Sequence, residues 1–411
     1  MSDVGSNAAV VEELDLGDDR LYTRRDMEPV WRGLLERDAV VWTPPGHGHR
    51  GFWSVFSHEA CRAVLADDGS FTSRHGMFIG FDTAHPDTGG GRMIVVSEGE
   101  RHEWLRAVVG RYFARAMTGP LHAVLVEQVD ALIDVLRAAP VTDAAGRVST
   151  WVPNEIVCEV LGVPAGDREQ FRQLTHFAVG APDDPPAMSP SAAHTRIMAY
   201  LAELVMARRR HRGDDLISAL LHEGGLSVED VLLNCDNVFA AGNATTQHSV
   251  AAMLHALAVT PGLAERLHGD RRLLRPAVEE LLRWSTPGPH VLRVATADVE
   301  VNGVRLPAGA PVACWLMVAN RDPRVFAEPD RFDPARQPNR HLTFGAGVHY
   351  CLGAALARME LKVLLDRLTA AARSVALADP PVRLRSTKVN GYRQLRVTFQ
   401  WRTPARMGAS A

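Results

Sequence analysis

The sequence predicts a mainly α-helical fold with a few small β-sheets. Helical patterns dominate the stretch between Glu100 and Trp284. After Trp284 the chain changes to short strand patterns, of which Val299–Leu306 is a hairpin because Asn302-Gly303 supplies its turn. Helices and strands do not alternate along the chain, so we do not expect a parallel βαβ sheet.

The composition narrows the class of protein. The 411 residues are 46% hydrophobic and 23% charged, which is ordinary for a soluble protein with a large core. A formal net charge of −3 argues against general affinity for nucleic acids. No run of about 18 apolar residues and no N-terminal leader is present, so we expect a cytoplasmic protein without a membrane anchor. The scattered cysteines fit a reducing compartment rather than a disulfide framework; they are Cys61, Cys158, Cys235, Cys314 and Cys351.

One domain is expected over residues 18–403, between a disordered N-terminus (1–17) and a flexible tail (404–411). Its first elements are a helix, a hairpin and a second helix that Ser57 caps; their expected ranges are Pro29–Arg37, Ala39–Trp42, Gly51–Phe56 and Ser57–Leu65.

Two segments without periodicity interrupt the helical part. Arg74–Glu100 contains three consecutive glycines, and loops of that length in a compact domain are usually functional or mobile. Gly180–Ser191 contains four prolines, and we interpret it as a connection between two helices that moves as a lid. A second hairpin is expected at Lys388–Tyr392, again from an Asn-Gly pair.

The longest helix is expected from Ser227 to Thr260, where Pro261 and Gly262 follow. Ser227 and Asp230 resemble a capping box. At 1.5 Å per residue the helix is about 50 Å long, and its nearly continuous apolar character predicts a central, buried position.

The middle of this helix reads Ala241-Gly242-Asn243-Ala244-Thr245-Thr246. Gly242 weakens a helix by about 1 kcal/mol relative to alanine, and the hydroxyl of Thr245 can bond to the preceding turn. Together they favour a local kink. Small residues that allow close helix packing are the simpler explanation.

A glycine-rich loop, Phe344–Gly353, leads into a helix whose apolar residues share one face. Cys351 lies just before that helix, where free N–H groups and the helix dipole favour a thiolate. Gly345, Gly347 and Gly353 allow a flat ligand or a neighbouring backbone to come close. A thiolate in this position can be the axial ligand of a haem iron, whereas a cysteine that only fills space is the plainer alternative.

The loop pattern Phe-Gly-x-Gly-x-His-x-Cys-x-Gly is filled at every fixed position and resembles the haem-binding loop of the cytochrome P450 family, the haem-thiolate monooxygenases. Ordered motifs extend the resemblance over roughly residues 98 to 400. It implies the P450 fold, with haem b between the long central helix and the helix after the cysteine loop. It also implies that Cys351 binds the iron and that Phe344, Gly345 and Gly353 shape the loop around the haem.

Further residues match family positions that bind the two haem propionates. These are His102 and Arg106, in a His-x-x-x-Arg pattern on one helix, together with Arg293 and His349. Individually, each of them could be an ordinary surface residue.

A charged network is also implied. Glu280 and Arg283 match the family's Glu-x-x-Arg, and Arg331, in Pro329-Asp-Arg-Phe332, matches the third arginine. The resemblance implies that these three are buried and support the Cys351 loop. Spacing alone would predict only a surface ion pair worth a few tenths of a kcal/mol.

The central helix matches the family's oxygen-activation motif, but Ala244 stands where an acid is usual. We therefore expect Thr245 to control protonation, with Gly242 and Asn243 as the other catalytic candidates. Asn243, Gln247, a substrate hydroxyl or water could replace the missing carboxylate.

Electrons must come from outside, because the chain has no flavin, dinucleotide or iron–sulfur motif. We expect NAD(P)H to supply them through a ferredoxin reductase and a ferredoxin. A basic patch for the ferredoxin is expected from Arg111, Arg115, Arg340 and Arg358, although a solvated charged face explains them equally well.

The substrate candidates are mostly apolar, which predicts a hydrophobic small molecule, although core packing explains such residues as well. They are Phe78, Ile79, Phe81, Ala240, Ala244, Val291, Leu292 and Val389.

The sequence thus predicts a monomeric bacterial monooxygenase that inserts one atom of O₂ into a natural product such as a polyketide, peptide, terpenoid or macrolide. Oxidative coupling or peroxide-driven chemistry is the first alternative, for which Ala244 leaves room. A haem sensor without turnover is the second, and it leaves the long loop and the proline-rich segment unexplained.

Overall fold

The computed structural model describes residues 14–403 except 25–26, 39, 47, 81–88, 120, 180–186 and 223–225. Within that part of the chain, none of the helices is long and apolar enough to cross a membrane. The helices are α2 (Met27–Glu36), α3 (His58–Ala66), α4 (Gly99–Thr118), α5 (Leu121–Ala138), α6 (Ser149–Leu161), α7 (Arg168–Val179), α8 (Pro190–Arg210), α9 (Leu216–His222), α10 (Val228–Val259), α11 (Leu263–Gly269), α12 (Leu274–Ser285), α13 (Leu316–Ala319) and α14 (Ala354–Ala371).

The strands of the described residues form four small sheets. The largest has the spatial order β1 (Val40–Thr43), β2 (Phe52–Val55), β8 (Pro311–Cys314), β5 (Val291–Ala295) and β3 (Phe71–Thr72), and only β2 and β8 run parallel. The others are β4 (Thr142–Asp143) with β12 (Arg396–Trp401) and β9 (Ala372–Leu377), β6 (Val299–Val301) with β7 (Val304–Leu306), and β10 (Val382–Arg383) with β11 (Tyr392–Gln394).

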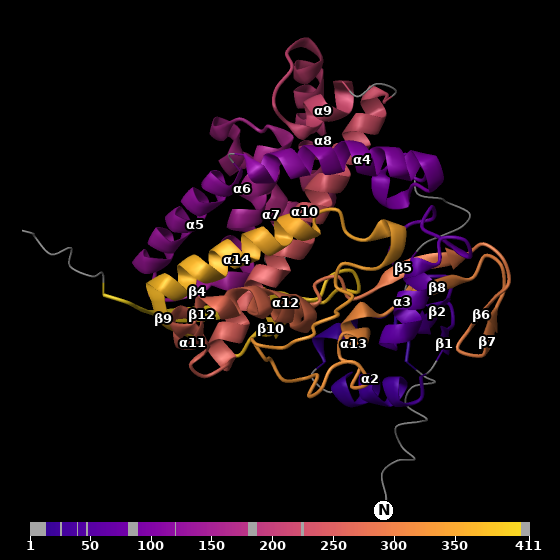
Figure 1. The fold of residues 1–411 in the computed structure, drawn as a ribbon. Coiled ribbons are helices and arrows are strands. Elements are labelled where there is room, and N and C mark those ends of the chain that lie inside the picture. Colours follow the sequence, from indigo (N-terminus) through magenta and orange to yellow (C-terminus); the bar gives the residue numbers. More distant parts are fainter. Residues whose placement is uncertain are drawn as a thin grey trace, which may run out of the picture.

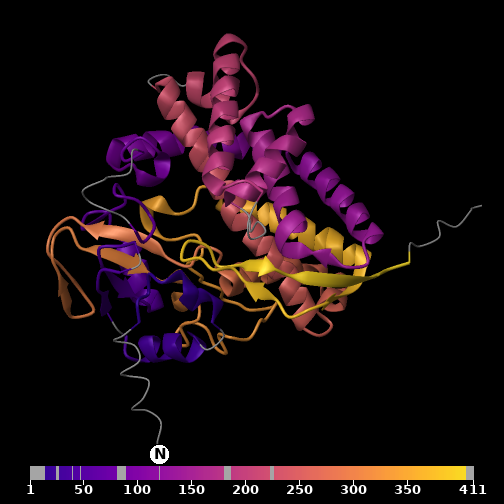
Figure 2. The same ribbon diagram turned by 180° about the vertical axis from the view of Figure 1, so that it is seen from behind.

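The helices and the largest sheet occupy different parts of the molecule. Figures 1 and 2 show α4 to α10 and α14 together on one side and the five-stranded sheet on the other. The predicted mainly helical class with small sheets is therefore confirmed. The main hydrophobic core joins α10 and α14, with Met253 and Leu254 of α10 and Leu361 and Leu364 of α14 all buried in it.

Local sequence signals predicted several elements correctly. Ser57 caps α3 by accepting a hydrogen bond from Ala60 N at 3.2 Å, and Ser227 caps α10 by accepting one from Asp230 N at 3.0 Å. The hairpin of β6 and β7 turns at Asn302-Gly303, where both residues have positive φ angles, of 47° and 77°. That is the backbone that a two-residue hairpin turn requires.

The second predicted hairpin is wrong in its turn. The partner of β11 is Val382–Arg383, and the residues between the two strands form a loop rather than a tight turn. Asn390 instead holds this loop to the end of α12, because its side chain donates to Ser285 O at 2.6 Å and its N–H to Pro287 O at 2.8 Å. Gly391 lies against the ring of His248, which leaves no room for a Cβ atom.

The predicted disordered N-terminus extends too far along the chain. Leu16 is buried, and its carbonyl accepts a hydrogen bond from the Tyr22 hydroxyl at 2.8 Å. Asp15 lies 2.8 Å from the Nε2 atom of His49. Residues 1–13 and the predicted tail, 404–411, lie outside the described residues, as does most of the proline-rich segment.

Candidate active site

The loop around Cys351 has the geometry that its glycines predict. The N–H of Cys351 donates to Phe344 O at 2.9 Å, which closes the turn before α14. Gly345 and Gly347 have φ angles of 72° and 71°, in the left-handed region that favours glycine. A Cβ atom on Gly347 would lie 2.7 Å from Leu65 O, so this glycine also lets the loop pack against α3.

Cys351 differs from the other four cysteines of the described chain, because it is exposed and they are buried. Protein atoms nevertheless surround its sulfur, and this desolvation raises the pKa of the thiol. The N–H groups of Gly353 and Ala354 and the guanidinium groups of Arg106 and Arg358 act in the opposite direction. In the protein without haem, desolvation of the thiol therefore outweighs the effect of the helix terminus.

The four predicted cationic side chains come together beside this loop. His102 and Arg106 lie one turn apart on α4, and the His102 ring centroid is 4.2 Å from that of His349. Burial lowers the pKa of His102 to about 4, and the charges of His349, Arg106 and Arg293 lower it as well. His102 is therefore neutral at pH 7, and the positive charge of the cluster lies on its neighbours.

Arg293, on β5, is a buried guanidinium that lacks a carboxylate partner among the described residues. Its Nη1 donates to Leu292 O at 2.9 Å, and burial lowers its pKa. A buried charge without a counter-ion is costly. The cluster therefore has the chemistry of a site for the carboxylates of a ligand.

Glu98 belongs to the same cluster, although no sequence pattern selects it. Its Oε1 accepts hydrogen bonds from Thr72 Oγ1 at 2.9 Å, from Ser73 N at 2.6 Å and from Ser73 Oγ at 2.9 Å. Burial alone would raise the pKa of Glu98, but His349 and these hydrogen bonds lower it to about 2. Glu98 is therefore ionised.

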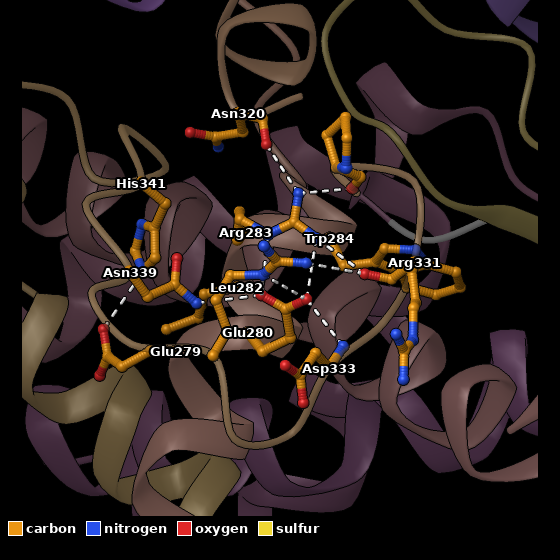
Figure 3. Close-up of polar contacts among 12 residues, drawn as sticks. Glu279, Glu280, Leu282, Arg283, Trp284, Asn320, Arg331, Asp333, Asn339 and His341 are labelled. Carbon is orange, nitrogen blue, oxygen red and sulfur yellow. Dashed lines mark hydrogen bonds and ion pairs between the residues drawn. The ribbon is translucent and has the colours of Figure 1, made fainter. Parts of the chain in front are cut away.

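The predicted pair of Glu280 and Arg283 is fully buried on α12, with Nε–Oε2 and Nη2–Oε1 distances of 2.8 Å. Glu280 also accepts hydrogen bonds from Asp333 N at 2.9 Å and from Asn339 Nδ2 at 3.0 Å. Figure 3 shows the carboxylate at the centre of this network. These donors satisfy the buried carboxylate, as a buried ion pair requires.

The third arginine of the network is Arg336 and not the predicted Arg331. The side chain of Arg331 is 67% exposed and pairs with Glu328, and only its carbonyl accepts a hydrogen bond from Arg283. Figure 3 shows its guanidinium turned away from Glu280. Arg336 Nε lies 3.0 Å from Glu280 Oε2 and its side chain is 9% exposed.

Asn320 connects this network to the cysteine loop, and sequence reasoning missed it. Its carbonyl accepts a hydrogen bond from Arg283 Nη1 at 2.8 Å. Its side chain donates to the hydroxyls of Thr286 and Thr343, both at 2.9 Å, and accepts from Leu342 N at 2.7 Å. The fully buried amide therefore fixes the strand of chain that enters the loop.

A second carboxylate on α12, Glu279, holds the chain that leaves the loop. It accepts hydrogen bonds from Arg358 Nε at 2.7 Å and from His341 Nε2 at 3.1 Å, and these partners lower its pKa to about 2 although burial acts in the opposite direction. The Arg358 guanidinium lies 4.5 Å from the Phe344 ring centroid and donates to the Tyr350 hydroxyl. Arg358 thus supports the loop.

The expected basic patch is consequently smaller than predicted. Arg358 is engaged by Glu279, and Arg115 lies 2.9 Å from Asp214. Arg111 and Arg340 are exposed.

Thr245 and Ala241 lie on one face of α10. Ala241 is exposed in mid-helix, and the Thr245 hydroxyl donates to its carbonyl at 3.0 Å. Asn243 is turned the other way, since residues two apart on a helix point in nearly opposite directions. It is 1% exposed, and its Nδ2 donates to Phe239 O at 3.0 Å. Asn243 therefore does not share the face of Thr245, which corrects its selection as a catalytic candidate.

Gly242 provides close contact between helices. A Cβ atom there would lie 2.6 Å from Val157 Cγ2 of α6. The helix continues unbroken through this residue to Val259. The alternative that small residues serve helix packing is therefore correct for Gly242.

The predicted substrate residues divide into two groups. Five are half-buried, as residues that border a ligand would be: Phe78, Ala240, Ala244, Val291 and Val389. Ile79 and Leu292 are instead buried in a core cluster with Trp315, so their selection is wrong. The reason for Leu292 is the alternation of a strand, which turns it away from the face of Val291. Phe81 lies outside the described residues.

His290 was not predicted as a site residue. It connects the segment before β5 to the loop that contains Phe78 and Ile79. Its Nε2 accepts a hydrogen bond from Ile79 N at 3.1 Å, and its ring meets Phe78 edge to face at 6.1 Å. Burial lowers the pKa of His290 to about 4, so the ring is neutral and can accept that bond. A cavity of about 550 Å³ between α2 and α13 includes none of the predicted site residues, so it does not mark the active site.

Comparisons with known proteins agree with this geometry. The family model described as cytochrome P450 matches residues 192–369. Cytochrome P450 NovI of Streptomyces niveus is 34% identical over 87% of this chain and 89% of its own length. Mycinamicin IV hydroxylase/epoxidase of Micromonospora griseorubida is 32% identical over 86% of this chain and 89% of its own.

A solved structure extends the match to the whole fold. P450 OxyD, which is involved in the biosynthesis of vancomycin-type antibiotics, superposes with a TM-score of 0.91 at 48% identity. The match covers 95% of this chain and all of OxyD. The chain therefore belongs to the cytochrome P450 family, the haem-thiolate monooxygenases.

Proposed function

We propose that this protein inserts one oxygen atom from O₂ into a hydrophobic natural product, by hydroxylation or epoxidation, during the biosynthesis of a secondary metabolite. The observation that carries the proposal is the exposed Cys351 at the start of α14 beside a cluster of cations. The cluster includes the buried Arg293, which has no carboxylate partner within the described part of the chain. Relatives named for antibiotic biosynthesis and for a hydroxylase/epoxidase activity support the substrate class.

The residues present fit haem b. Cys351 would bind the iron, and a thiol that coordinates a metal loses its proton even where burial opposes this. Arg106, Arg293 and His349, with His102 beside them, would hold the propionates. When bound, the haem supplies a thiolate-ligated iron that activates O₂.

The chain's own residues then control protons and position. Thr245 holds its hydroxyl proton against Ala241 O on the exposed face of α10. Neither Asn243 nor Gln247 replaces the missing acid, because both are 1% exposed and lie about half a helical turn from Thr245. We assign that task to a substrate hydroxyl or a water molecule.

Electrons would come from NAD(P)H through a ferredoxin that docks on the face of the cysteine loop. Val348 and Tyr350 are exposed there, at 42% and 38%, and the basic Arg340 is exposed in the segment that enters the loop. An apolar centre with a charged margin suits a transient protein partner. The protein would act as a monomer in the cytoplasm.

The decisive experiment has two parts. The reduced protein is treated with carbon monoxide, and a strongly red-shifted Soret band is expected from a thiolate-ligated haem; its absence would refute the cofactor assignment. Candidate natural products are then screened for a shift of the iron from low to high spin, and those that bind are tested for turnover with a ferredoxin system.

Ala244 favours one second candidate, which is peroxide-driven oxidation or oxidative coupling. Without a carboxylate beside Thr245, protonation by the protein is weaker, and hydrogen peroxide already contains the required protons. Faster turnover with hydrogen peroxide alone than with the ferredoxin system would favour this candidate. A sensor would show neither turnover nor a substrate-induced spin shift.

A further inference from the structure

Glu98 lies where three distant segments of the chain meet. It precedes α4, Thr72 ends β3 and Ser73 follows that strand, and His349 belongs to the cysteine loop. Three hydrogen bonds from Thr72 and Ser73 reach its carboxylate at the single oxygen Oε1. His349 Nε2 lies 3.0 Å from Ser73 Oγ and 3.8 Å from Glu98 Oε1.

Which group donates and which accepts in these bonds follows from the number of protons that each group carries. An ionised carboxylate only accepts, so the one proton of the Ser73 hydroxyl is donated to Glu98. The Ser73 oxygen can then only accept from His349, and Nε2 of the imidazole must carry a proton. The chain of donors runs from His349 through Ser73 to Glu98, and it fixes which edge of the imidazole faces Ser73.

The charge of Glu98 also reaches the other members of the cluster. It opposes the effect of burial on both His102 and Arg293. A negative charge among several cations reduces their mutual repulsion before any ligand carboxylate binds.

We propose that Glu98 is a positioning residue which, through the hydroxyl of Ser73, orients His349 toward the haem propionates. This inference rests on the proposed function, because it assumes that haem binds beside Cys351. Glu98 acts on the cofactor only through Ser73 and His349 and through its charge.

The experiment measures how fast the ferric holoprotein transfers its haem to excess apomyoglobin. Ser73→Ala breaks the chain of donors, and Glu98→Ala removes its end, so each should release haem about tenfold faster, as expected for the loss of one charge-assisted hydrogen bond. Because Glu98→Ala removes both the end of the chain and the charge, the double variant should release haem no faster than Glu98→Ala alone. Additive effects would contradict a shared chain.

Glu98→Gln separates hydrogen bonding from charge, because its Oε1 can still accept the bonds from Thr72 and Ser73. It should release haem more slowly than Glu98→Ala. It should also shift the iron reduction potential to a more positive value, since a negative charge that stabilises the oxidised iron is lost. Glu100→Gln is the matched control, because Glu100 is an exposed acid two residues further along, in the first turn of α4, and its charge is screened by solvent.

The outcomes distinguish the two proposals. If the wild-type protein binds no haem, the proposed function fails. If wild-type holoprotein forms normally but Ser73→Ala and Glu98→Ala release haem at its rate, Glu98 is not a positioning residue. Unfolding temperatures of all variants show whether faster release reflects the orientation of His349 or general destabilisation; should Glu98→Ala not fold, Ser73→Ala and Glu98→Gln decide the question.

Discussion

Single residues decide how this chain handles protons and how it braces its cysteine loop. Thr245 keeps a hydroxyl on the exposed face of α10, while its neighbour Ala244 offers no carboxylate. The family motif identified Thr245, but it could not show that Asn243 points into the protein. Nearby residues of a helix point in different directions, whereas the motif specifies only their order in the sequence.

Replacing Thr245 with alanine should raise hydrogen peroxide release and lower product formation by about tenfold, because protonation would lose its hydroxyl donor. The measurement is peroxide and product formed per NAD(P)H consumed. Thr246→Val removes the adjacent, buried hydroxyl and should leave that ratio unchanged. Equal coupling in wild type and Thr245→Ala would contradict the assigned role.

A single residue also decides which arginine, Arg331 or Arg336, completes the network of Glu280. Both follow α12 by a similar distance in sequence, and a contact through space selects Arg336. Arg336→Ala should lower the free energy of unfolding by about 3–5 kcal/mol, because it leaves the buried Glu280 carboxylate short of a partner. Arg331→Ala, at an exposed pair, should change it by less than about 0.5 kcal/mol. Urea unfolding of both variants measures these losses. A larger loss of unfolding free energy for Arg331→Ala would reverse the assignment.

At the scale of elements, features set by local sequence could be predicted, whereas features set by long-range contacts could not. The caps of α3 and α10 and the hairpin of β6 and β7 were predictable, because residues within a few positions of one another determine them. The loop before β11 was not, because Asn390 bonds to the end of α12 and Gly391 lies against His248. No local pattern records either contact.

Gly242 makes the packing of α10 against α6 testable. Alanine is the better helix former by about 1 kcal/mol, yet Gly242→Ala should destabilise the protein by about 1–3 kcal/mol because its Cβ would overlap Val157. Adding Val157→Ala should recover part of that loss in the same urea titration. Gly33→Ala in α2, where nothing lies within 4 Å of the added Cβ, should be neutral or stabilising. A stabilising Gly242→Ala would contradict the packing role.

At the scale of the whole molecule, the motifs predicted the family and the mainly helical fold, because they lie in order along most of the chain. They did not predict how buried titratable groups set the dependence of stability on pH. Burial lowers the pKa values of His248, His255 and His290 to about 4 and raises that of Glu360 to about 8.

Whether each group makes the fold more or less stable as the pH changes follows from where it binds a proton, in the folded or in the unfolded chain. The three histidines bind protons in the unfolded chain below about pH 6.5 but stay neutral in the folded one, so their contribution is lost as the pH falls from about 6.5 to 4. Glu360 is protonated only when folded, so stability falls as the pH rises from about 4.5 to 8. The histidines outnumber it, and we expect a maximum near pH 6.5.

Urea unfolding at several pH values between about 5 and 8 measures this profile. Glu360→Gln should flatten the decline above about pH 6.5, because it removes the group that titrates there. A wild-type stability that is constant from about pH 5 to 6.5 would contradict the assignment of neutral, buried histidines.

The neighbouring carboxylates of α12 also make the two ends of the cysteine loop depend on a single helix. Glu280, with Arg283 and Asn320, fixes the chain that enters the cysteine loop, and Glu279 fixes Arg358 just beyond it. Both ends of the loop are thus held by contacts with the same helix. A substitution that shifts α12 would therefore disturb both ends of the cysteine loop at once.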